Sequence, residues 1–183
     1  MSRSLRALRA TLLAVAGLLL ALGFPLVASP WAHAAADDQI DKYTIEYQMG
    51  ADGVLHAKET IVYRFGSNSG RHGIDRTFIT REKYDDNNDA VYTVDVTSVT
   101  SPTPGVATPY EKTKIETDSG RGEQVRVRIG DPDKTVSSAT ATYVISYTVK
   151  GAMRTFSGYD EFYWDVIGPD RTVIKDMSVT ATV

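Results

Sequence analysis

Large apolar residues alternate with polar ones along most of the chain after residue 36, with the two-residue period of a half-buried β-strand. The pattern first covers residues 43–49, YTIEYQM, and resumes over 54–65 after Asp52-Gly53, a strong tight-turn signal. In each run the set that should face a core is β-branched or aromatic. The pattern recurs in five further runs, around residues 92–96, 125–129, 141–149, 162–166 and 177–183.

No window of useful length shows apolar residues at helical spacing, and Gly, Pro, Asp and Asn cluster between the predicted strands. The chain after residue 36 is therefore predicted to be all-β. About eight short antiparallel strands with turns at this spacing favour a β-sandwich, with a β-barrel as the alternative. The long connections at about 66–90 and 101–110 should cross between sheets or cap their ends.

The N-terminus has the order of a secretory signal peptide. Arg3, Arg6 and Arg9 precede an apolar run over 12–22, and an Ala-His-Ala sequence at 32–34 supplies a cleavage site. The apolar run is short of the roughly twenty residues that span a bilayer. We therefore expect residues 1–36 to be a signal peptide and residues 37–183 a single extracytoplasmic domain, with an uncleaved N-terminal anchor as the alternative.

Loss of this segment makes the chain more acidic, because it holds three of the 20 basic residues and none of the 23 acidic ones. The resulting negative charge argues against nucleic acid or an anionic membrane surface as the main partner. The sequence has no cysteine, so the exported domain has no disulfide and no thiol chemistry. The alternating pattern runs to Val183, and we expect the chain to be the N-terminal part of a longer, membrane-anchored protein.

The densest group of charged residues lies in SGRHGIDRTF, residues 69–78. Gly73 permits a sharp bend, and Asp75 lies between Arg71 and Arg76, with which it can form an ion pair. We interpret the segment as a structural corner of the sandwich. The alternative is a ligand site, for which Arg71, His72, Asp75 and Arg76 are the candidate binding residues.

Catalysis or zinc binding by histidine has few candidates, because only His56 and His72 follow the signal peptide and they lack the spacing of a zinc site. A catalytic triad could form only around His72, and no G-x-S-x-G nucleophile elbow supplies its serine. Paired carboxylates could hydrolyse glycosides. Asp160, Glu161 and Asp165 are the candidates, with Glu161 and Asp165 expected on one strand face. An ordinary acidic strand face is the favoured interpretation, so we assign no catalytic residue.

A third candidate is the acidic loop at residues 84–89, where Asp85, Asn87 and Asp89 place oxygen atoms at alternate positions, as a calcium ion requires. The calcium loop pattern is incomplete, because Ala90 replaces its turn glycine and Val96 its bidentate glutamate. A solvated turn rich in Asp and Asn is therefore favoured, and we expect neither a metal ion nor a cofactor.

Several short motifs follow one another over nearly all of residues 37–183. They are Tyr43 to Met49, Asp52-Gly53, Glu59-Thr60, His72-Gly73-Ile74 with Arg76, Ile129-Gly130-Asp131-Pro132, Tyr143 to Tyr147 and Glu161-Phe162-Tyr163-Trp164-Asp165. In this order they resemble the N-terminal exported domain of the bacterial predicted membrane proteins grouped as domain of unknown function 2207. At the position of Asp75 the family more usually has a bulky aromatic residue, so the ion pair of Asp75 would be particular to this chain.

The resemblance implies a signal peptide, a β domain outside the membrane and a later transmembrane segment, and it brings no activity and no catalytic residue. We therefore expect a non-enzymatic extracytoplasmic module that acts in interaction or structure at the cell envelope. Its partner would be an envelope protein or polymer, and it would touch the membrane only through a signal or a downstream anchor. The alternatives are a carboxylate-dependent envelope hydrolase and a calcium-binding adhesive domain.

Overall fold

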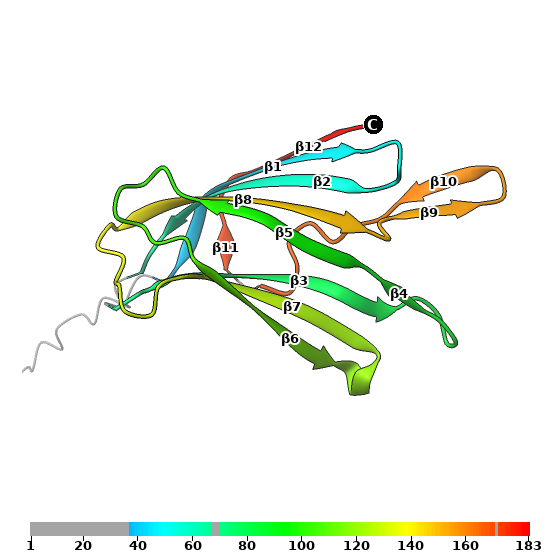
Figure 1. Ribbon diagram of the computed structural model, residues 1–183, viewed down its shortest axis with the longest axis horizontal. Coiled ribbons are helices and arrows are strands. Elements are labelled where there is room, and N and C mark those ends of the chain that lie inside the picture. Colours follow the sequence, from blue (N-terminus) through cyan, green and yellow to red (C-terminus); the bar gives the residue numbers. More distant parts are fainter. Residues whose placement is uncertain (1–36, 67–69, 171) are drawn as a thin grey trace, which may run out of the picture. The chain divides into compact units, whose positions relative to one another are not determined.

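The computed structural model describes residues 37–66, 70–170 and 172–183 (Figure 1). The predicted signal peptide, residues 1–36, lies outside this range. All described elements belong to one compact unit, Ala35–Val183. Among the described residues there is no helix of the length and apolar character needed to cross a membrane.

The larger sheet has six strands in the order β11-β1-β2-β8-β5, and β12 also pairs with β1. Neighbours are antiparallel except at one side, where β11 and β12 both run parallel to β1. The bounds of these strands are β1 Gln39–Met49, β2 Leu55–Arg64, β5 Thr93–Thr100, β8 Thr140–Lys150, β11 Val173–Ile174 and β12 Met177–Thr182.

The smaller sheet has four antiparallel strands in the order β4-β3-β7-β6. Its strands are β3 Gly73–Lys83, β4 Asp89–Val91, β6 Tyr110–Thr117 and β7 Gly122–Gly130, with a short 3-10 turn, η1 Asp118–Gly120, between the last two. A separate hairpin of β9 Met153–Phe156 and β10 Tyr159–Phe162 follows β8 and extends away from both sheets (Figure 1).

The two sheets form the two layers of a sandwich, and their facing residues make one apolar core (Figure 1). Five tyrosines, at 43, 47, 92, 143 and 147, lie in this core with aliphatic residues of β1, β2, β7 and β8. Phe78 of β3 packs on Tyr147 of β8, with ring centroids 4.7 Å apart, and joins the layers. The predicted all-β sandwich is confirmed.

Individual strands were predicted less well. The segment 66–90, expected to be a connection, contains β3 and the start of β4, and β6, β9 and β11 were not foreseen. In β3 the residues directed at the core are Ile74, Arg76, Phe78 and Thr80. Because two of these four are polar, the alternation of apolar and polar residues that predicts a strand is missing here. The strand expected over 162–166 is also wrong, because β10 ends at Phe162 and the chain then leaves the sheets.

Candidate functional site

Arg76, one of the four predicted binding residues, lies in the core and pairs with Glu59 of β2. Its Nε and Nη2 each donate to a different carboxylate oxygen of Glu59 over 2.9 Å, a bidentate arrangement. The two side chains are 4% and 0% exposed. The expected pairing of Arg76 with Asp75 is therefore wrong, because adjacent residues of a strand point to opposite faces of the sheet.

Further hydrogen bonds complete the surroundings of this pair. The hydroxyl of Tyr147, in β8, donates to Glu59 Oε1 over 2.6 Å. Arg76 Nη1 donates to the carbonyls of Thr77 and Ile167 over 2.7 and 2.8 Å, and Nη2 also donates to that of Val166 over 2.9 Å. Every nitrogen of the guanidinium thus has a partner, as a charge removed from water requires.

The buried charges shift the ionisation of their neighbours. Burial alone would lower the pKa of Arg76, but the Glu59 carboxylate and the adjacent tyrosines raise it well above its usual value. Burial, followed by the charge of Glu59, raises the pKa of Tyr147 well above the ordinary value for tyrosine. Arg76 is therefore protonated, and Tyr147 is a hydrogen-bond donor, near neutral pH.

The segment 165–170 closes over Arg76 along the free edge of β3. Asp165 Oδ1 accepts from the backbone N–H groups of Ile167 and Gly168, and Asp170 Oδ2 accepts from the N–H of Thr77 over 3.0 Å. Gly168 has φ +76°, and a Cβ there would stand 2.3 Å from the Thr77 carbonyl oxygen and 2.9 Å from Arg76 Nη1. Only glycine allows the loop to approach this closely.

A cavity of about 30 Å³ adjoins Arg76 and is lined by residues that include Tyr43, Asp75 and Asp170. This volume accommodates one or two water molecules at most. The Arg76 centre is therefore a structural tie between the two sheets and the 165–170 loop, with no room for an organic ligand.

The other three predicted binding residues are also engaged within the fold. Arg71 pairs with Asp38 over 2.8 Å, and Asp75 pairs with Arg128, opposite it on β7, over 3.3 Å. His72 Nδ1 lies 3.0 Å from the carbonyl oxygen of Lys134 and 3.3 Å from that of Asp131. The structure thus separates Arg76 from the other three, which lie nearer the surface.

Two glycines explain the bend at the start of β3. Gly73 and Gly130 are opposite each other in the β3–β7 ladder. A Cβ on Gly73 would lie 1.8 Å from the carbonyl oxygen of Ile129, and a Cβ on Gly130 would lie 2.1 Å from that of His72. The motifs His72-Gly73-Ile74 and Ile129-Gly130-Asp131-Pro132, far apart in sequence, therefore form one close contact.

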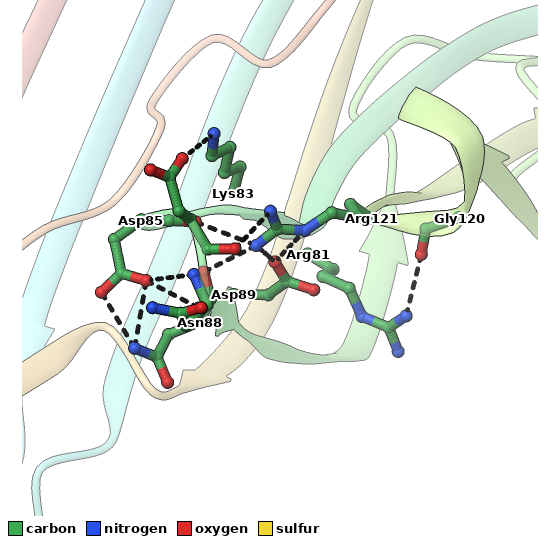
Figure 2. Close-up of polar contacts among 9 residues, drawn as sticks. Arg81, Lys83, Asp85, Asn88, Asp89, Gly120 and Arg121 are labelled. Atoms are coloured by element: carbon green, nitrogen blue, oxygen red, sulfur yellow. Dashed lines mark hydrogen bonds and ion pairs between the residues drawn. The ribbon is translucent and has the colours of Figure 1, made fainter.

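The acidic loop before β4 is organised around an arginine (Figure 2). Asp85 Oδ1 accepts from the backbone N–H groups of Asn87 and Asn88. Arg121 pairs with the Asp89 carboxylate and donates to the carbonyls of Asp85, Asp86 and Asn88. The guanidinium thus already binds several of the oxygen atoms that a calcium ion would need. The described residues contain no group of three acidic or histidine side chains placed to hold a metal.

The candidate catalytic carboxylates do not converge. Glu161, in β10, pairs with Arg154 of β9 over 3.3 Å, whereas Asp165 caps its own turn after β10 has ended. Neither the cavity at Arg76 nor the groove described below is lined by either residue or by Asp160. Their expected position on one strand face is wrong, because the strand does not continue past Phe162.

An open groove of about 770 Å³ remains on the larger sheet. It lies on the outer face, because its polar residues alternate along β1, β2 and β8 with residues buried in the core. Glu46 and Lys58 form an exposed ion pair across it, 3.3 Å apart. Its other outward-facing lining residues, with hydroxyl, amide or imidazole groups, are Gln48, His56, Thr97, Ser146, Thr148, Thr180 and Thr182. The only sign of this groove in the sequence was that polar residues alternate with core residues along these strands.

Comparison with known proteins gives one family. Residues 39–183 match the model of the family described as "Predicted membrane protein (DUF2207) N-terminal domain". A search of curated proteins found no match.

Proposed function

The chain belongs to the DUF2207 family of predicted membrane proteins, and we propose that its β-sandwich is a non-enzymatic binding module on the extracytoplasmic side of the cell envelope. The observation that carries the proposal is the polar groove on the outer face of the larger sheet. The four candidate binding residues and two of the three candidate carboxylates, Glu161 and Asp165, form contacts within the fold. The groove, in contrast, presents its polar side chains to solvent.

The chemistry of the groove indicates the class of partner. Threonine and serine hydroxyls, one amide, one imidazole and the Glu46–Lys58 pair can all form hydrogen bonds with a polar chain. No tyrosine or tryptophan ring forms an exposed platform there, since the two tyrosines of the lining, Tyr47 and Tyr147, are buried. The groove therefore suits a polar polymer or an extended peptide held by hydrogen bonds.

Export is the second part of the proposal, supported by the signal-peptide pattern of residues 1–36. A fusion of the chain to a reporter enzyme that is active only outside the cytoplasm tests it. Reporter activity that is lost when Arg3, Arg6 and Arg9 are replaced by glutamate supports export. A fusion that is produced in full length, as immunoblotting will show, but whose reporter stays inactive refutes it.

Binding is tested by sedimentation of the purified chain with isolated cell-wall polymer and, separately, with membrane fractions. Thr148→Arg places a long side chain in the groove and should reduce binding at least tenfold. The matched control is Thr113→Arg, an exposed threonine of β6 in the other sheet, which should bind as the parent chain does. Equal binding by the parent and T148R would exclude the groove as the contact surface.

The reaction product distinguishes the hydrolase alternative from the binding module. Release of soluble fragments from the polymer that stops in both E161Q and D165N would refute a purely binding role. The module predicts binding without fragment release, and unchanged behaviour of both carboxylate variants.

A further inference from the structure

The four edges of the two sheets differ in how they resist pairing with another strand. An unprotected edge presents free N–H and C=O groups to any strand that approaches, and proteins usually shield it with charges, bulges or shortness. Three edges here are shielded. The edge strand β4 has three residues, β5 has a bulge between Val96 and Ser98, and β6 carries Glu111, Lys112, Lys114 and Glu116.

The fourth edge is formed by the two-residue β11 and by β12, and its longer part, β12, has none of these protections. Its sequence, Met-Ser-Val-Thr-Ala-Thr, contains no charged residue, glycine or proline, and five of its six residues are exposed. One side of β12 pairs with β1 from Tyr43 to Gln48, and the other side has no partner among the described residues. Val179 is 46% exposed although Ile45, its partner in the ladder, is completely buried.

We propose that β12 is the docking edge for a second copy of this chain, which adds its own β12 antiparallel across a two-fold axis and joins the two larger sheets. A two-fold axis perpendicular to the sheet reverses the strand direction, so the pairing must be antiparallel. Opposite residues must also point to the same face. A register centred on Thr180 then places Val179 against Ala181 on the core side, and Ser178 against Thr182 on the outer side.

Self-pairing of this kind favours an uncharged strand, because a charge at the central position would face its own copy across the axis. β12 brings together only small, β-branched and hydroxyl side chains, which pair well across strands. The same operation on β6, centred on Thr113, would place Lys112 against Lys114, which repel each other. The uncharged composition of β12 therefore favours a second copy of the same strand as the occupant.

The pairing would extend the outer groove. Thr180 and Thr182 line the groove at its β12 side, so the grooves of the two copies would meet at the axis. The dimer does not depend on what the groove binds, and the two proposals fail separately, since oligomeric state is measured without any ligand.

The first test measures the molar mass of the full chain by analytical ultracentrifugation from about 1 μM to 1 mM. We expect a concentration-dependent monomer–dimer equilibrium. T180K and T180E should each weaken the dimer at least tenfold, and an equimolar mixture should restore it because lysine then faces glutamate across the axis. T113K, on the edge of the other sheet, is the matched control and should dimerise like the parent chain.

The second test uses the absence of cysteine from the sequence. T180C supplies one thiol at the axis, close to its counterpart in the second copy, so mild oxidation should give a covalent dimer at concentrations where T113C stays monomeric. A parent chain that is monomeric at 1 mM, a T180K–T180E mixture that remains monomeric, open-ended oligomers, or equal crosslinking of T180C and T113C would each overturn the proposal. Circular dichroism checks that each variant is folded.

Discussion

Replacing Arg76 by methionine should destabilise the domain strongly, because it leaves the Glu59 carboxylate buried without its counter-ion. The side chain loses two bonds to Glu59 and three to the carbonyls of Thr77, Val166 and Ile167. Removal of one partner of a buried ion pair typically costs about 3–5 kcal/mol. That is a large share of the roughly 5–15 kcal/mol that stabilises an ordinary domain, and it corresponds to about 6–20 °C in Tm.

The assay is urea unfolding followed by the fluorescence of Trp164, which is 8% exposed in the core. Asp75→Asn is the matched control, because the Asp75–Arg128 pair is solvent-exposed and such pairs contribute at most about 1 kcal/mol. A double variant, E59M with R76M, should lose less than the sum of the two single changes, since it leaves no unpaired charge. Additive losses, or an R76M domain within about 1 kcal/mol of the parent, would refute the role assigned to this pair.

Further predictions concern the loop, the buried hydroxyls and the acidic turn. Gly168→Ala should destabilise the domain by about 1–3 kcal/mol, whereas Gly158→Ala, at similar positive φ but with no atom within 4 Å of the added Cβ, should cost less, as thermal unfolding will show. Tyr143→Phe should preserve or raise stability at pH 7, because the Tyr143 hydroxyl is buried and has no hydrogen-bond partner among the described residues. A loss above about 1 kcal/mol in urea unfolding would contradict this. Burial raises the pKa of Tyr143 to about 12, so the stability tied to its neutral form is complete below pH about 10, its unfolded value, and is lost as pH rises toward 12. Y143F should flatten that alkaline loss in urea unfolding measured at intervals of pH. Thermal unfolding should give the same Tm with added calcium and with chelator, because Arg121 already occupies the oxygen atoms of the acidic loop.

Several of the motifs that carry the family resemblance meet in space, which gives them a physical explanation. Glu59, Arg76 and Tyr147 form the buried centre, while Trp164 and Asp165 begin the loop that covers it. In the sequence alone, these charged and aromatic residues resemble the residues of a catalytic or binding site. Their geometry assigns them to the joining of two sheets.

The two-residue period of apolar positions and the composition were sufficient to predict the all-β class and the main strands. In β1, β2 and β8 one face is buried, which makes apolar and polar residues alternate. The same rule failed at β3, where a charged residue occupies a core position, and at 163–166, where Trp164 is buried from a loop. The alternation of apolar and polar residues predicts the direction of a side chain only where the strand continues and its buried face is apolar.

The partners of the charged side chains were decided by the tertiary structure. Arg76 is one residue from Asp75 in the chain, but its partner Glu59 comes from the opposite sheet, and Arg121 reaches the acidic loop from beyond β6. Sequence proximity carries little information about such pairs, because a strand directs consecutive side chains to opposite faces and the packing of sheets brings together distant segments. The sequence by itself determined the class of fold, and the packing of the two sheets determined which charges are buried and which surface stays open.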